Sequence, residues 1–145
     1  MLLNYQGSII AALLGLGLAA YFANRILSIE VTDSKVQSLS DAIRKGSMAF
    51  LKRQYSWVSI FVVILAVLIS TLTDWGYPYG AIAFIGGALF SSLAGFIGMR
   101  IATAANGRTT EAARDGGTLK ALPVAFRGGA VMGFSVAGLG LLGVA

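Results

Sequence analysis

The chain alternates four long apolar stretches with shorter polar connections. No charged side chain occurs in residues 1–24, 54–73, 75–99 or 128–145. Each stretch approaches the roughly 20 residues that a helix needs to cross about 30 Å of hydrocarbon. Backbone amides in lipid must be paired within their own segment, and these stretches lack the alternation of barrel strands. The pattern therefore predicts an all-α polytopic membrane protein with four transmembrane helices, over residues 3–25, 55–73, 78–104 and 124–145.

The composition agrees with lipid as the solvent. Hydrophobic residues make up 57% of the 145 residues and charged residues 12%, and the mean hydropathy is +0.79. A soluble domain of this length has too small a core to bury that much apolar surface. The first stretch has no basic segment before it and is too long for a secretory signal, so we interpret it as a transmembrane helix.

The basic residues predict the orientation in the membrane. The only charged residue between the second and third spans is Asp74. Basic connections stay cytoplasmic, so we expect the N-terminus and the Asp74 turn outside and the segment 26–54 in the cytosol. The net charge of +5 then requires no nucleic-acid partner. All eleven basic residues lie in the other two connections: Arg25, Lys35, Arg44, Lys45, Lys52 and Arg53 in the first, and Arg100, Arg108, Arg114, Lys120 and Arg127 in the last.

Aromatic residues gather where the second and third spans should cross the headgroup layers. Such residues are typical interfacial anchors. Pro78 suits the first turn of the third helix, where a missing amide hydrogen costs nothing. The predicted anchors are Tyr55, Trp57, Trp75, Tyr77 and Tyr79.

Small residues recur at every fourth position in three of the spans. This spacing lets helix backbones approach closely in lipid, so we expect helix neighbours there rather than ligand contacts. The second span is mostly Val, Ile, Leu and Phe, which predicts a lipid-facing helix. The predicted packing stripes are Gly7, Ala11, Gly15, Ala19 and Ala23; Ala83, Gly87, Ser91 and Gly95; and Gly129, Gly133 and Ala137.

The cytoplasmic segment 26–54 has helical periodicity. Val36, Leu39, Ile43 and Phe50 share one face, which predicts an amphipathic helix. Ser34 followed by Gln37 resembles a capping box that would start it. Such a helix lies in the interface, docks on the protein's own cytoplasmic surface, or continues into the second span as one long helix. Gly46 is the expected weak point.

Candidate chemistry is sparse. Histidine and cysteine are absent, which excludes His-based zinc sites, disulfides and His-dependent nucleophiles within this chain. The pair Glu111 and Asp115, at helical spacing, would suit Mg²⁺ beside a phosphate, but we interpret it as part of a solvated, mixed-charge loop. The dipeptide 116–117 lacks the Lys-Ser/Thr of a P-loop. We therefore predict no catalytic, cofactor-binding or metal-binding residue here.

Three segments resemble one family, the membrane-integral, ion-translocating (vacuolar-type) inorganic pyrophosphatases. They are residues 40–55 (SDAIRKGSMAFLKRQY), 95–114 (GFIGMRIATAANGRTTEAAR) and 121–143 (ALPVAFRGGAVMGFSVAGLGLLG). With the spans between them, the resemblance covers essentially the whole chain in the family's order.

The resemblance implies a sixteen-helix homodimeric pump that couples hydrolysis of Mg²⁺-pyrophosphate to transport of H⁺ or Na⁺, with K⁺ as a further possible cofactor. Residues 1–145 would be its N-terminal portion, four outer-ring helices without the family's acidic Mg²⁺-pyrophosphate motifs. The last span stops in mid-pattern, which agrees with a longer chain. The implied location is a bacterial or archaeal plasma membrane, or else the membrane of an acidic organelle.

An alternative hypothesis stays open at this point, a self-contained four-helix membrane assembly or small transporter subunit. Small exporters generally need a membrane-embedded acid to couple to protons. The four charge-free stretches supply none, which favours the pump portion.

Overall fold

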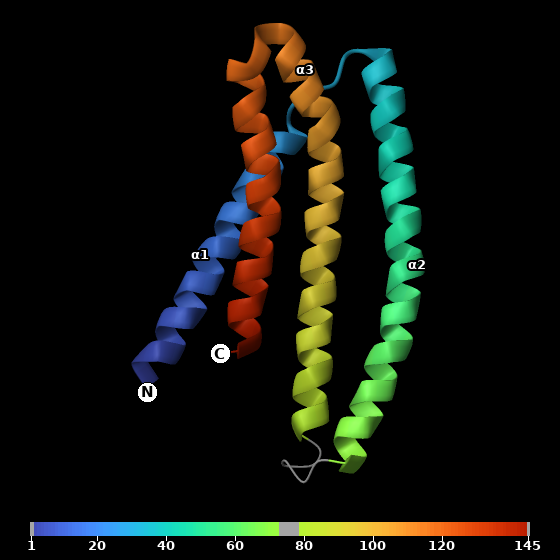
Figure 1. Cartoon of the computed structure of the whole chain (residues 1–145). Helices are drawn as coiled ribbons and strands as arrows, with labels where there is room; N and C mark the ends of the chain where they lie inside the picture. Colours follow the sequence, from blue (N-terminus) through green and yellow to red (C-terminus); the bar gives the residue numbers. More distant parts are fainter. Residues whose placement is uncertain (1, 73–78, 145) are drawn as a thin grey trace.

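The computed structural model describes residues 2–72 and 79–144, with side chains from Tyr5 onward. Three helices follow in order, α1 (Leu2–Leu27), α2 (Ser34–Leu72) and α3 (Tyr79–Val144). The helix α3 packs against both α1 and α2, and it forms the middle of the assembly (Figure 1). All three helices are long and apolar enough to cross a membrane, so the predicted all-helical membrane architecture is confirmed.

The helix α3 folds back on itself at two glycines. Gly116 and Gly117 have non-helical backbone angles, and Gly117 has a φ of 64°. Glycine adopts this left-handed conformation without the steric penalty of a Cβ atom. The chain reverses there, so residues 79–115 (the first arm) and 118–144 (the second arm) lie side by side (Figure 1). Residues 104–124, which were predicted to connect two spans, are therefore helical except at this tight turn. The backbone keeps helical angles up to the two glycines on either side.

An aspartate starts α2. The Oδ1 atom of Asp33 accepts hydrogen bonds from the backbone N–H groups of Lys35 at 2.7 Å and Val36 at 3.1 Å. These are donors that the first turn of a helix cannot satisfy itself. The capping box predicted at Ser34 is wrong, since Ser34 is already the first helical residue.

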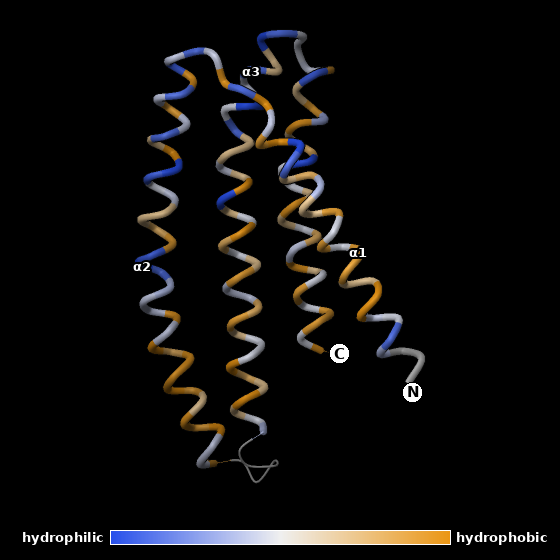
Figure 2. The backbone as a smooth tube through the Cα atoms, turned by 180° about the vertical axis from the view of Figure 1, so that it is seen from behind, coloured by the Kyte–Doolittle hydropathy of each residue, from blue (hydrophilic) through white to orange (hydrophobic). Residues whose placement is uncertain are grey.

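The segment 34–54 and the second span form one continuous helix. The helix α2 has 39 residues, a length of about 58 Å at 1.5 Å per residue, well beyond the roughly 30 Å of hydrocarbon. Of the three arrangements considered for the amphipathic segment, the structure has the continuous helix, and Gly46 does not interrupt it. Figure 2 shows the change along α2 from a hydrophilic half near Ser34 to a hydrophobic half near Leu72.

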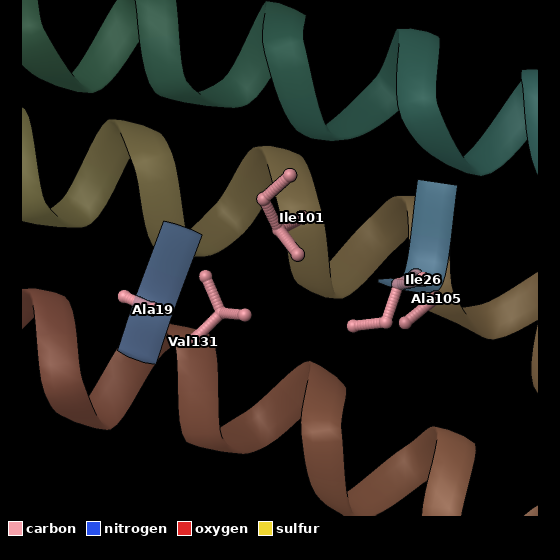
Figure 3. Close-up of a cluster of buried hydrophobic side chains, with 5 residues drawn as sticks. All are labelled: Ala19, Ile26, Ile101, Ala105 and Val131. Atoms are coloured by element: carbon pink, nitrogen blue, oxygen red, sulfur yellow. The ribbon is translucent and has the colours of Figure 1, made fainter. Parts of the chain in front are cut away.

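The core lies between α1 and the two arms of α3. Ile26 from α1 is fully buried and Val131 from the second arm is 1% exposed. Figure 3 shows these side chains with Ala19, Ile101 and Ala105 in one cluster. Alanines and β-branched side chains here let three helices meet at short range, which is how membrane helices associate without a hydrophobic driving force.

Glycines set the closest helix contacts, but not all of them are those predicted. A Cβ atom on Gly128 would lie 2.8 Å from Ala105 Cβ, and one on Gly138 would lie 2.8 Å from Leu16 Cγ. The predicted stripe of Gly129, Gly133 and Ala137 is instead exposed. The packed face of the second arm is thus displaced from the stripe, because α1 and the first arm approach it from the opposite side.

Trp57 and Tyr55, both predicted as aromatic anchors, differ in their exposure and in their contacts. Trp57 is 69% exposed, as an anchor in the interface should be. Tyr55 is partly buried, and its hydroxyl donates a hydrogen bond to the Ser92 carbonyl at 2.5 Å, so it joins α2 to the first arm. The residue predicted as an interfacial anchor therefore also forms a contact between two helices. The predictions for Asp74, Trp75, Tyr77 and Pro78 lie outside the described residues.

Candidate functional site

Three polar side chains on one face of the first arm hold the connection between α1 and α2. Arg108, Glu111 and Arg114 follow each other at intervals of three residues, which places them along one side of a helix. Their partners lie at the end of α1 and in the segment 28–33 that follows it. We call the six residues the polar clasp: Leu27, Thr32, Asp33, Arg108, Glu111 and Arg114.

Glu111 is the buried member of the clasp. It is 6% exposed, and its Oε1 atom accepts a hydrogen bond from the Thr32 hydroxyl at 2.5 Å. Arg114 Nη1 lies 3.9 Å from the same oxygen. The interpretation of Glu111 as part of a solvated loop was therefore wrong: it sits on a helix and faces the connection that packs over it. Asp115 is exposed, as expected.

Asp33 joins the helix cap to the clasp. While Oδ1 caps α2, Oδ2 accepts a hydrogen bond from Arg114 Nη1 at 2.6 Å. The backbone N–H groups of Val36 and Lys35, and then the Arg114 guanidinium, hold the pKa of the Asp33 carboxyl below its ordinary value. The same carboxylate therefore fixes both the start of α2 and its distance from the first arm.

Arg108 closes the clasp at the end of α1. Its Nη1 atom donates to the Ala104 carbonyl at 2.8 Å, and its Nη2 atom donates to the Leu27 carbonyl at 3.4 Å. This satisfies one of the carbonyls that the last turn of a helix leaves unpaired. Within the described part of the chain, Arg108 Nε and Glu111 Oε2 are buried without a hydrogen-bond partner.

A second contact of the same region depends on Gly107. A Cβ atom there would overlap Ser40 Oγ and would lie 3.7 Å from Val36 Cγ1. The first turns of α2 therefore pack directly on the backbone of the first arm, one residue before Arg108. Cap, clasp and glycine contact together set the position of the hydrophilic half of α2.

The clasp does not suit a magnesium ion. One oxygen of Glu111 is already taken by Thr32, and the guanidinium groups of Arg108 and Arg114 lie on the same helix face. Mg²⁺ requires several oxygen ligands in near-octahedral geometry. Among residues 2–72 and 79–144, no three acidic residues gather closely enough to hold a metal. What the clasp does is structural: it ties three helices together at one end.

Comparison with known proteins now gives the family. A family model described as inorganic H⁺ pyrophosphatase matches residues 13–145, which include all three segments on which the resemblance rests and the whole clasp. The chain belongs to this family of pyrophosphatases. The recognition made from residues 40–55, 95–114 and 121–143 is confirmed.

Curated relatives of this pyrophosphatase family include proton and sodium pumps. The chain is 46% identical over 134 residues to a K⁺-insensitive pyrophosphate-energized proton pump of Methanosarcina mazei, covering 92% of this chain and 20% of the relative. It is 39% identical over 139 residues to a putative K⁺-stimulated pyrophosphate-energized sodium pump of Bacteroides thetaiotaomicron, covering 93% and 19%. The chain spans about one fifth of the length of these relatives.

Sequence reasoning missed the clasp, although a signal for it was present. The spacing of Arg108, Glu111 and Arg114 shows a shared helix face once the segment 105–115 is taken as helical rather than as a loop. Their partners Thr32 and Asp33 lie about 80 residues away in sequence. Only the folded pyrophosphatase chain brings the two groups together, because the reversal at Gly117 and the packing of α1 decide which face the connection meets.

Proposed function

We propose that this chain is the N-terminal, outer-ring portion of a pyrophosphate-energized proton or sodium pump. The observation that carries the proposal is the family match over residues 13–145, together with relatives that are named as such pumps and are about five times as long. In this proposal the chain supplies a scaffold, and hydrolysis takes place on residues beyond it.

The chemistry proposed for the whole protein is hydrolysis of pyrophosphate. When Mg²⁺ is bound by acidic residues, it neutralises the charge of the pyrophosphate and helps activate a water molecule. Glu111 takes no part in this, because it is buried in the clasp against Thr32. The relatives are named both K⁺-insensitive and K⁺-stimulated, and both proton and sodium pumps. K⁺ therefore remains a further possible cofactor, and the transported ion is H⁺ or Na⁺.

The proposed topology has four crossings, counting each arm of α3 separately, with the N-terminus outside. The support is the distribution of charge: the eleven basic residues lie in the two connections that adjoin the Gly116–Gly117 turn and the start of α2. In Figure 2, hydrophilic positions concentrate toward that end of the bundle. Basic connections remain in the cytosol, so the polar clasp would be cytoplasmic.

The proposed contacts with the rest of the pump follow from the exposed faces. Gly129, Gly133 and Ala137 are exposed on the side of the second arm away from α1, and a small-residue face is typical of helix packing rather than of lipid contact. The membrane half of α2 instead exposes large side chains such as Ile60, Phe61 and Ile64. We propose that the second arm faces inner helices of the pump, that α2 faces lipid, and that the whole protein is a homodimer.

The activity test compares the full-length protein with residues 1–145 alone, both purified from membranes. The full-length protein should release phosphate from pyrophosphate in a Mg²⁺-dependent manner, and the chain alone should not. Hydrolysis by residues 1–145 would show that catalysis does not lie elsewhere. Absence of hydrolysis from the full-length protein would refute the pump assignment itself.

The topology test uses a cysteine at residue 73, in a full-length protein without other cysteines. Thr73→Cys should react with a membrane-impermeant maleimide added from outside. A second cysteine, replacing Thr118 near the α3 turn, should react only after the cytosolic side is opened. The reverse labelling pattern would invert the proposed orientation.

A further inference from the structure

The face between α2 and the first arm carries a continuous apolar groove. Its first section has a volume of about 340 Å³ and begins at Tyr55 and Ser92. Its second section, of about 400 Å³, continues to Thr71 and Ala81. The two sections share Val62, Val63 and Ile85, so the groove runs for about 24 Å along α2 at 1.5 Å per residue. That length covers most of the hydrocarbon thickness.

Basic side chains lie on the same helix faces just beyond one end of this groove. Lys52 precedes the groove-lining Ser59 by seven residues, and Arg100 follows the groove-lining Leu89 by eleven. Seven and eleven residues are close to two and three whole turns, so each cation stands on the face of its helix that lines the groove. Lys45, a further seven residues before Lys52, extends the row.

The register of the two helices places both cations beyond the same end of the groove, about 7.5 Å apart along the helix axis at 1.5 Å per residue. The Tyr55–Ser92 hydrogen bond and the Gly107–Ser40 contact show that α2 and the first arm run antiparallel. Lys52 lies about one turn beyond Tyr55, and Arg100 lies about two turns beyond Ser92 in the same direction. Both are exposed, and both have long side chains that reach several ångströms toward the interface.

The cations have no protein partners among the residues that the structure describes. Within that part of the chain, no ion pair or hydrogen bond engages the side chains of Lys45, Lys52 or Arg100, although the backbone carbonyls of Lys52 and Arg100 accept hydrogen bonds from Ser56 and Thr103. The acid on the same face of α2, Asp41, lies one turn past Lys45, away from the groove. The groove mouth is therefore a site of net positive charge next to an apolar channel.

We propose that this groove binds one anionic phospholipid, with an acyl chain along Val62, Val63 and Ile85 and the phosphate held by Lys52 and Arg100. The charge at the mouth selects a negative headgroup, because cations near an interface attract anionic lipids. The apolar walls favour a hydrocarbon chain over a free phosphate. The proposal rests on the proposed function in one respect, that α2 faces lipid rather than another helix of the pump.

Native mass spectrometry of the full-length protein tests the site, with added phosphatidylglycerol or phosphatidylcholine of identical acyl chains. The double variant K52Q/R100Q should bind phosphatidylglycerol about tenfold more weakly than the wild type, with little change for phosphatidylcholine. The matched control K120Q/R127Q removes one lysine and one arginine from the second arm, which lines neither section of the groove, and should bind as the wild type does. Equal loss in both variants, or in neither, would refute the site.

A second variant tests the acyl chain. Ala88 lines the groove, so Ala88→Trp should weaken the binding of both lipids, whereas Ala49→Trp, on an exposed position outside the groove, should not. Inorganic phosphate in excess should not displace phosphatidylglycerol. Binding unaffected by Ala88→Trp, or competed by phosphate, would show headgroup attraction without a groove site. A wild type that binds neither lipid would refute the lipid site.

Pyrophosphate hydrolysis measured on the same samples separates the two proposals. Hydrolysis without selective phosphatidylglycerol binding would refute the lipid site and leave the pump assignment intact. Selective phosphatidylglycerol binding without hydrolysis would support the lipid site and refute the pump assignment.

Discussion

The Thr32 hydroxyl donates a hydrogen bond to Glu111 Oε1 at 2.5 Å, although 79 residues separate the two in sequence. This contact joins the segment between α1 and α2 to the first arm of α3 at a buried carboxylate. Its neighbours on either side, Arg108 and Arg114, engage the end of α1 and the cap of α2. One face of one helix therefore positions the ends of the other two.

Removing the buried carboxylate should destabilise the protein. Glu111→Ala leaves the Thr32 hydroxyl without an acceptor and should lower the free energy of unfolding by about 1–3 kcal/mol. Glu111→Gln retains an acceptor for Thr32 and should cost less. Thermal unfolding of the full-length protein in detergent measures both. Asp115→Ala, at an exposed carboxylate one turn away, is the control; a larger effect there than at Glu111 would contradict the clasp.

The Asp33 carboxylate should make stability depend on pH. Its pKa lies below the ordinary 3.8 because the N–H groups of Val36 and Lys35 and the Arg114 guanidinium favour the charged form. A carboxyl group whose pKa falls on folding stabilises the fold above its unfolded-state pKa, and that stabilisation is lost as the pH falls through the folded-state pKa.

Asp33→Asn tests this dependence, because asparagine still caps a helix but does not ionise. The melting temperature of the variant should lie below that of the wild type at neutral pH. The difference should shrink as the pH falls below the ordinary value of 3.8. Asp41→Asn, on the exposed face of α2, is the control. If the difference in melting temperature between the wild type and Asp33→Asn grew as the pH fell, the proposed role of the charged Asp33 carboxylate would be contradicted.

The glycines of the helix contacts should differ sharply in their tolerance of a methyl group. At Gly138 a Cβ atom would lie 2.8 Å from Leu16 Cγ and 3.0 Å from the Ala12 carbonyl oxygen. The backbone of α1 cannot move away without disturbing its helix, so Gly138→Ala should lower the free energy of unfolding by about 1–3 kcal/mol. At Gly46 nothing lies within 4 Å, and Gly46→Ala should stabilise α2 by about 0.5–1 kcal/mol. Thermal unfolding compares the two, and stabilisation by Gly138→Ala would contradict the observed packing.

The Tyr55 hydroxyl should contribute to stability although Tyr55 lies near the predicted interface. Tyr55→Phe removes only the oxygen that donates to the Ser92 carbonyl, and a loss of about 1 kcal/mol is expected. Tyr79 is 75% exposed, so Tyr79→Phe is the matched control and should have no measurable effect. Equal melting temperatures for the Tyr55→Phe variant and the wild type would show that the hydrogen bond does not hold α2 against α3.

Several features of the fold follow from local sequence. Charge-free stretches of about 20 residues predict membrane helices because lipid offers no partner for an unpaired amide. The helical character of residues 34–54 follows from the spacing of Val36, Leu39 and Ile43. The family follows from segments such as 95–114, whose order of residues is specific. None of these conclusions requires knowledge of which helix lies beside which.

The contacts between helices depended on the tertiary structure. The second arm has two faces made of small residues. One carries Gly129, Gly133 and Ala137, and the other carries Gly128 and Gly138. Lipid gives no hydrophobic preference between the two faces. The packed face was decided by how α1 crosses the two arms. Tyr55 likewise has an apolar ring and a polar tip, which suit an interface and a helix contact equally.

By itself, the sequence determined that the chain is helical, lipid-embedded and a member of the pyrophosphatase family, because hydrophobic length, charge and residue order are local properties. Only the tertiary structure decided that Glu111 is a buried clasp residue rather than part of a solvated loop. Burial is a property of neighbours, and Thr32 and Asp33 become neighbours of Glu111 only when α1 and α2 have packed against α3.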